Sequence, residues 1–126
     1  ENKNHDKKEA VIDLDTLIKR GFDETLIKEV VSIFITENSK YIQKLKNEIV
    51  KRNVDKIKFY AHGIKGSAAN VGAIQLSEYA FDLEKMARQA DISKAQQFME
   101  KIEQEYNKVK AFAAEADWIE TAKKNS

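Results

Sequence analysis

The residues of this chain best suited to do chemistry lie between positions 61 and 72, where the sequence reads AHGIKGSAANVG. This run contains His62, one of two histidines, with Lys65 three positions later and Gly66 four positions later. In a helix, residues at these spacings share one face. An imidazole, an ammonium group and bare backbone would then lie side by side, and Ala69 would keep the next turn of that face low.

These residue types favour a histidine that another protein must reach. A neutral imidazole is a nucleophile near neutral pH, and Lys65 could place a positive charge beside any group attached to the ring. Gly63 and Gly66 each weaken a helix interior by about 1 kcal/mol relative to alanine, and a missing side chain one turn after His62 would let a bulky partner approach. A histidine that merely borders the core would have the same spacing, so the residues alone leave both interpretations open.

Other kinds of site match the sequence poorly. A metal site in a helical bundle uses Glu-x-x-His pairs, but Phe59 stands three positions before His62. Binding of a metal by His62 and Glu84 alone is therefore disfavoured. The phosphate-binding loop pattern is absent. Ser67 would lie about 140° from His62 around a helix, so it is expected to be a packing residue and not a nucleophile.

The composition indicates one globular, heavily charged domain. Of the 126 residues, 42% are hydrophobic and 34% are charged. The 22 Lys and Arg and the 21 Asp and Glu residues are interspersed, which disfavours nucleic acid as a partner. The chain has no cysteine, no signal-peptide pattern and no apolar run near the roughly 20 residues that a membrane span needs. We therefore expect a cytoplasmic domain without direct membrane contact.

The spacing of apolar residues predicts helices along most of the chain. With no proline and four glycines, the sequence contains few residues that break a helix. A short helix over 11–20 would end at Gly21, and Asp23, Asn53 and Asp91 are suited to cap the helices that follow. The expected long helices span about 24–51, 54–71, 73–89 and 92–122.

Each long helix carries an apolar stripe that we expect to be buried. In the 24–51 helix the stripe consists of Leu26, Val30, Phe34, Tyr41, Leu45 and Ile49. In the helix that contains His62 it consists of Ile57, Ala61, Ile64, Ala68 and Val71.

Four long amphipathic helices with short connections predict an all-α fold, an antiparallel up-down-up-down bundle with the short first helix at one end. The last helix would be roughly 45 Å long, so its end, with Trp118 and Ile119, is expected to pack on the short first helix. The bundle domain would cover residues 11–122, between a polar linker or tail at 1–10 and a C-terminal tail at 123–126. A closed bundle buries its own core, so a monomer is expected.

The run from 61 to 72 closely resembles the signature of histidine-containing phosphotransfer (HPt) domains. That signature is His-x-hydrophobic-Lys-Gly-Ser/Ala, with a glycine ten positions after the histidine, which is Gly72 here. Leu76 and the pair Leu83-Glu84 also stand where the family carries a leucine and a Leu-Glu. The resemblance covers about 11–112 in helix pattern and 58–88 in motif detail.

The resemblance implies that His62 carries a phosphoryl group on its outer nitrogen, Nε2, and that Lys65 stabilises the phosphate charge. Gly66 would clear room for the rim of a receiver domain, and Gly63 departs from the family pattern in a way that could loosen the helix. Glu84 matches a position near the imidazole, where it would either orient the ring or stay solvated. The implied partner-binding residues are Gly66, Ala69, Lys58 and Glu84.

The family also implies the setting in which the domain works. The partners would be response-regulator receiver domains, which supply the aspartate and Mg²⁺, so this domain would need no cofactor and have no kinase activity of its own. The linker-like start and the absence of an initial methionine favour a C-terminal, cytoplasmic module of a hybrid sensor histidine kinase. The alternative is a helical bundle that docks proteins without being phosphorylated.

Overall fold

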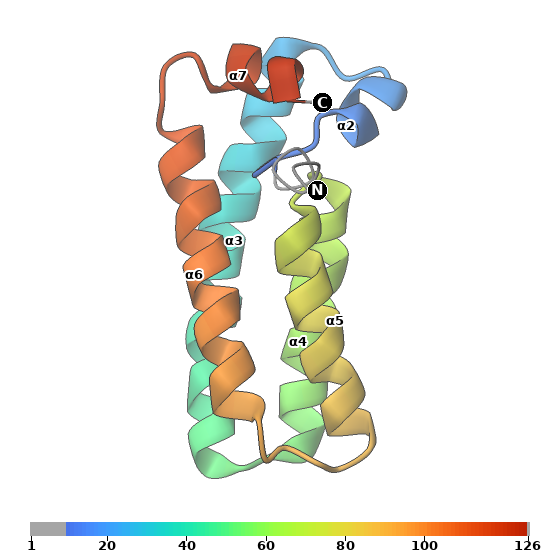
Figure 1. The fold of residues 1–126 in the computed structure, drawn as a ribbon, viewed down its shortest axis with the longest axis vertical. Coiled ribbons are helices and arrows are strands. Elements are labelled where there is room, and N and C mark those ends of the chain that lie inside the picture. Colours follow the sequence, from blue (N-terminus) through green and yellow to red (C-terminus); the bar gives the residue numbers. More distant parts are fainter. Residues whose placement is uncertain (1–9, 126) are drawn as a thin grey trace, which may run out of the picture.

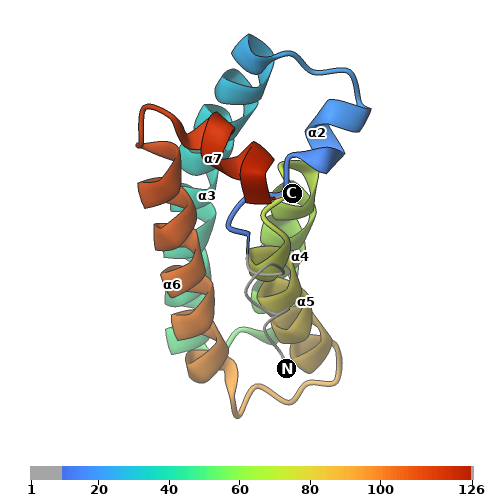
Figure 2. The same cartoon turned by 45° about the horizontal axis from the view of Figure 1, so that its top comes forward.

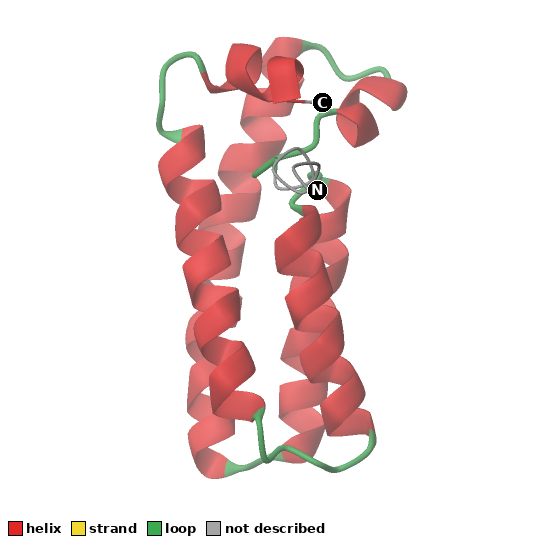
Figure 3. Ribbon diagram, viewed as in Figure 1, coloured by secondary structure: helices red, strands yellow, loops and turns green. Residues whose placement is uncertain are grey.

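The computed structural model describes residues 10–125, and all of their regular secondary structure is helical (Figure 1, Figure 3). Residues 1–9 and 126, which hold most of the predicted linker and the last residue of the predicted tail, lie outside the described residues. The helices are α2 (Asp15–Lys19), α3 (Glu24–Lys51), α4 (Val54–Asn70), α5 (Ile74–Arg88), α6 (Ala95–Ala113) and α7 (Trp118–Asn125).

Helices α3 to α6 form the predicted antiparallel bundle, with α2 and α7 at one end (Figure 1, Figure 2). Short connections impose this arrangement, because only Arg52 and Asn53 separate α3 from α4. Arg52 adopts the left-handed conformation with φ 58°, and Asn53 then caps α4 by accepting a hydrogen bond from the backbone N–H of Lys56 at 3.3 Å. Asp23 caps α3 in the same way through Leu26 N–H at 2.9 Å. Both predicted caps are confirmed.

The prediction of one continuous last helix over 92–122 is wrong. Helix α6 ends at Ala113, and after a turn α7 begins at Trp118 and runs across the end of the bundle (Figure 2). This bend lets Trp118 and Ile119 reach 4% and 3% exposure, whereas a straight continuation would carry both side chains into solvent. Helix α7 continues through Asn125, so residues 123–125 are helical and not a tail.

The start of the last long helix also differs from its prediction. Asp91 does not cap the helix; its carboxylate accepts hydrogen bonds from Ser93 N–H at 3.2 Å and from Ser93 Oγ at 2.9 Å, and so stabilises the preceding turn. Helix α6 begins four residues later, at Ala95.

The predicted buried stripe is correct for α4 and partly wrong for α3. In α4 every expected residue is buried, from Ile57 to Val71. In the first turns of α3, Ile27 and Val31 are buried, whereas Leu26 is 38% exposed and Val30 only half-buried. The same shift by one residue recurs further along α3, where Tyr41 is half-buried and Ile42 is buried.

The turn between α4 and α5 anchors the segment that precedes α2. Gly72 has φ +80°, a conformation that favours glycine, and its carbonyl oxygen accepts a hydrogen bond from Asp13 N–H at 2.8 Å. A Cβ at Gly72 would collide with the carbonyl oxygen of Asp13. The glycine ten positions after His62 thus serves close backbone packing at the end of the helix that carries His62.

Candidate functional site

His62 lies on the outer side of α4. The neighbouring residues Ala61 and Ile64 are fully buried, and they fix the rotation of the helix so that the imidazole faces out. Its side chain is 64% exposed. The structure therefore places a solvent-accessible imidazole on a long, regular helix, which favours the reachable histidine over the one that merely borders the core.

Glu84 of α5 holds the inner nitrogen of this ring. His62 Nδ1 lies 2.9 Å from Glu84 Oε2, and the Glu84 side chain is only 2% exposed. A carboxylate can only accept a hydrogen bond, so Nδ1 must donate its hydrogen. In the neutral ring, Nε2 is then the nitrogen with a free lone pair, and it is the one left at the exposed edge.

The same carboxylate binds two cations. Lys65 Nζ lies 3.0 Å from Glu84 Oε1, and Arg88 Nη2 donates to Oε2 at 2.7 Å. Burial alone would raise the pKa of Glu84. Hydrogen bonds from Lys65 and His62 and the charges of Lys65 and Arg88 outweigh that effect and lower the pKa below its ordinary value. Glu84 is therefore ionised at neutral pH although it is buried.

One side of this cluster is bare surface. Gly66 is exposed, and a Cβ built there would meet no atom within 4 Å. Ala69, one turn further along α4, is also exposed, as is Lys58, one turn before His62. Phe59 adds an apolar ring that is 64% exposed. The ring edge of His62 thus lies in a low surface bordered by a cation and an aromatic side chain.

Gly63 does not belong to this bare surface, contrary to the sequence argument that treated the two glycines alike. A Cβ on Gly63 would lie 2.7 Å from Cε2 of Tyr41 in α3. The glycine therefore allows close packing of α4 on α3, and that packing supports the helix at the position where it was expected to loosen.

Ser67 also contributes to this packing between α3 and α4. Its hydroxyl lies 3.1 Å from Oδ1 of the buried Asn38 and 3.0 Å from the carbonyl oxygen of Gly63. Asn38 in turn donates to the carbonyl oxygen of Phe34 at 3.0 Å. The hydroxyl is committed to structural hydrogen bonds, which agrees with the expectation that Ser67 is a packing residue.

Two features of the site differ from the sequence interpretation. Glu84 was expected among the partner-binding residues, but it is buried beneath His62 and acts from within the domain. Arg88 was missed, although it stands four positions after Glu84 and therefore shares its helix face. The depth of Glu84 could not be inferred from α5 alone, because it depends on how α5 packs against α4.

The described part of the chain has neither a cluster of metal-ligand residues nor a membrane-spanning helix. It contains no group of three or more His, Cys, Asp or Glu residues that could hold a metal. None of its helices is both long enough and apolar enough to cross a bilayer.

Comparison with known proteins gives two matches. The family model described as "Hpt domain" matches residues 29–112, a range that includes the whole run from 61 to 72. The crystal structure of histidine-containing phosphotransfer protein B (HptB) from Pseudomonas aeruginosa PAO1 superposes with a TM-score of 0.76. The match covers 91% of this chain and 96% of that one at 19% sequence identity, and so shows a shared fold. No curated protein matches the chain.

Proposed function

The chain belongs to the Hpt domain family, and on that premise we propose that it is a phosphoryl carrier of a phosphorelay with His62 as its phosphoacceptor. The observation that carries this proposal is the contact between Nδ1 and the buried Glu84. It leaves the nucleophilic nitrogen at the exposed edge of the ring, in a place that a receiver domain can reach.

The transfer step uses only groups that this site and a receiver supply. The lone pair of Nε2 attacks the phosphorus of an aspartyl phosphate, the N–P bond forms, the P–O bond to the aspartate breaks, and the carboxylate leaves. The ring keeps its hydrogen on Nδ1 and gains positive charge, which the Glu84 carboxylate, 2.9 Å away, stabilises. Mg²⁺ bound by the receiver would neutralise charge on the transferring group. The reverse sequence of bonds passes the group to another receiver.

The proposed docking surface consists of Gly66, Ala69, Lys58 and Phe59 around His62. Gly66 leaves space for the partner's rim, because no atom lies within 4 Å of a Cβ placed there. Phe59 and Ala69 offer apolar contact area, and Lys58 offers a charge at the edge. Lys65, 26% exposed, pairs at 3.0 Å with the same Glu84 carboxylate that binds the imidazole, so it is a cation of the same cluster.

A direct test is incubation with receiver domains that carry a radiolabelled aspartyl phosphate. We expect label that is labile to acid and stable to alkali on the wild type, and none on His62→Gln. His5→Gln is the matched control, because it changes the only other histidine, and it should keep the label. Equal label on wild type and His62→Gln would refute the assignment. A wild type that binds receivers without taking label would instead support a docking bundle.

A further inference from the structure

Glu84 serves three partners with two oxygen atoms. Oε2 binds both His62 Nδ1 and Arg88 Nη2, at 2.9 and 2.7 Å, whereas Oε1 is paired with Lys65 Nζ at 3.0 Å. This ion pair is the contact that Oε1 makes within the described residues, where the buried oxygen accepts no well-directed hydrogen bond. The Lys65 ammonium also lies 4.9 Å from the centre of the Phe81 ring. In this state the Lys65 ammonium, which comes from α4, is paired with two side chains of α5.

This position conflicts with the role of Lys65 in the proposed function. To stabilise a phosphoryl group on Nε2, the ammonium must leave Glu84 or loosen its ion pair with Oε1. If Lys65 moved away, the buried carboxylate oxygen Oε1 would have no cation beside it. Leaving a buried charged group unpaired is costly. The buried carboxylate therefore opposes the movement that the phosphoryl group requires, unless another cation replaces Lys65.

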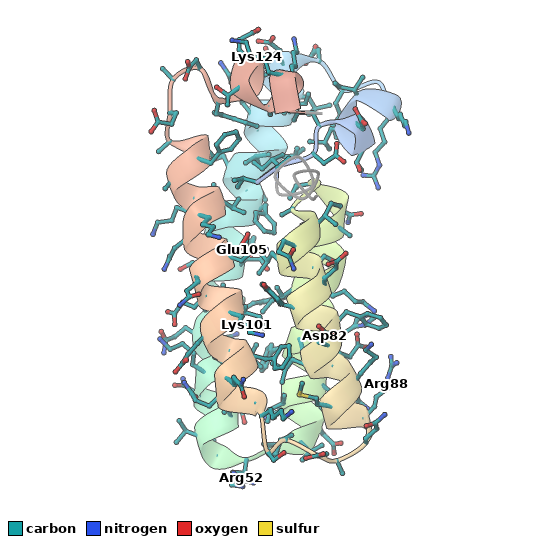
Figure 4. The ribbon with its side chains drawn as sticks, in the orientation of Figure 1. Arg52, Asp82, Arg88, Lys101, Glu105 and Lys124 are labelled. Carbon is teal, nitrogen blue, oxygen red and sulfur yellow. The ribbon has the colours of Figure 1, made fainter. Side chains whose placement is uncertain are left out.

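Arg88 is placed to be that cation. It lies four positions after Glu84 on α5, its side chain is 54% exposed, and it projects from the outer side of α5 (Figure 4). A guanidinium has five donors in a fixed plane and can bind both oxygens of one carboxylate. Its free N–H groups could reach Oε1 by a small rotation, since Nη2 already lies 2.7 Å from Oε2.

We propose that Arg88 is a positioning residue that frees Lys65 for the phosphoryl group. In the unphosphorylated protein Glu84 binds both Lys65 and Arg88. When His62 is phosphorylated, Lys65 moves to the phosphoryl oxygens, and Arg88 binds both oxygens of Glu84 and keeps its charge compensated. This inference rests on the proposed function of His62 and adds a movement of charges within the site.

A simpler possibility is that Arg88 forms only an ordinary surface ion pair with Glu84, of a kind that often contributes nothing measurable. The two cases differ in whether Arg88 and Lys65 depend on one another. If Arg88 forms an ordinary pair, Lys65→Ala should change the phosphorylation rate equally with and without Arg88. If Arg88 replaces Lys65 on Glu84, the effect of Lys65→Ala should depend on Arg88. A double-mutant cycle measures this dependence.

The test uses phosphoramidate as a small phosphoryl donor, so that no particular receiver is needed. The rate of phosphohistidine formation is measured for wild type, Lys65→Ala, Arg88→Gln and the double variant. In the wild-type background, Lys65→Ala should slow phosphorylation about tenfold, the effect of losing one hydrogen bond to a charged group. In the Arg88→Gln background it should slow phosphorylation no more than about twofold, because Lys65 already remains on Glu84. Arg88→Lys should recover part of the Lys65 effect.

Lys85→Gln is the matched control, since it removes the same charge from α5. Lys85 pairs with Asp82 at 3.6 Å and lies 4.6 Å from the centre of the Phe81 ring, which Lys65 also contacts, but it has no described contact with Glu84. The tenfold Lys65 effect should therefore persist in this background. Thermal melting followed by circular dichroism verifies that all variants are folded. A second readout is the ¹⁵N signal of the Lys65 ammonium, which should shift on phosphorylation of the wild type and shift less in Arg88→Gln.

The outcomes separate this inference from the function it rests on. Equal effects of Lys65→Ala with and without Arg88 would overturn the role of Arg88 and leave His62 as the phosphoacceptor. A wild type that takes no label on His62 from phosphoramidate or from phosphorylated receivers would overturn the proposed function, and the role of Arg88 with it.

Discussion

Replacing the buried carboxylate of the site should give a loss of stability that depends on pH. Glu84→Gln keeps the size and shape of the side chain and one acceptor oxygen, but removes the negative charge that binds Lys65 and Arg88. Its amide also adds a donor that must face one of these cations. The substitution therefore tests the electrostatic role of Glu84 with little change in packing.

The structure sets the size of this effect. Glu84 and Lys65 are 2% and 26% exposed, so their pair is shielded and should contribute about 1.5 kcal/mol. Arg88 and His62 are more than half exposed, and each adds only a few tenths of a kcal/mol, roughly, because solvent screens them. We expect Glu84→Gln to lower the free energy of unfolding by about 2 kcal/mol at neutral pH.

The pH dependence follows from the direction of the pKa shift. The pKa of Glu84 is lowered in the folded protein, so its contribution is fully present above the pKa of the unfolded chain, about 4.3. It is lost as the pH falls through the lower folded value. Asp91 also has a lowered pKa, because the side chain and backbone of Ser93 donate to it, but it is common to both proteins and cancels in the difference.

Urea denaturation followed by circular dichroism measures this difference. The gap between wild type and Glu84→Gln should be about 2 kcal/mol at pH values above about 5 and shrink in strong acid. Glu78→Gln is the control, because Glu78 is an exposed glutamate on the same helix, and it should change stability little at any pH. A gap of the same size at pH 7 and in strong acid would refute the reasoning, since the lost stability would then not come from the carboxylate charge.

Three further substitutions test the glycines. Gly66→Gln should slow transfer from a receiver about a hundredfold by displacing the receiver, and it should keep thermal stability because the space beside Gly66 is open. An unchanged rate would show that the receiver does not need this space. Gly63→Ala should lower the free energy of unfolding by about 1 kcal/mol, since the clash with Tyr41 exceeds the gain in helix propensity; a stabilised variant in urea denaturation would contradict this. Gly72→Ala should cost at least about 2 kcal/mol in the same assay, because φ is +80° and Asp13 blocks the Cβ; a smaller loss would show that the turn can relax.

The bundle could be predicted from the sequence because its signals are local. Asp23 and Asn53 mark helix starts, and the apolar repeat of α3 continues without interruption to Lys51. The bend between α6 and α7 was missed, since no glycine or proline marks it. The bend depends on the length of the other bundle helices. Beyond their ends, Trp118 can be buried only if the chain turns back across the bundle. Asp117, directly before Trp118, was a helix-start signal that could have been used.

In the site, too, features set within one helix could be predicted and features set between helices could not. The placement of His62, Lys65 and Gly66 follows from spacing within one helix and was predictable. The burial of Glu84 and the contact of Gly63 with Tyr41 depend on the register between helices, for which a single sequence carries no direct signal. Even so, the pairing of Arg88 with Glu84 lies within one helix turn and could have been proposed from spacing.

The hydrogen bonds around α4 explain how the site can have a fixed backbone while charged side chains change partners. Ser77 Oγ of α5 donates to the backbone carbonyl of Lys65 at 2.9 Å, and Ser67 of α4 bonds to the buried Asn38 of α3. The helix that carries His62 is thus fixed to both neighbours within about two turns of the imidazole, as in-line transfer requires. The proposed exchange involves only the ends of two long side chains on this scaffold, Lys65 and Arg88. The backbone can therefore hold His62, the proposed phosphoacceptor, in place during the proposed exchange of charged partners.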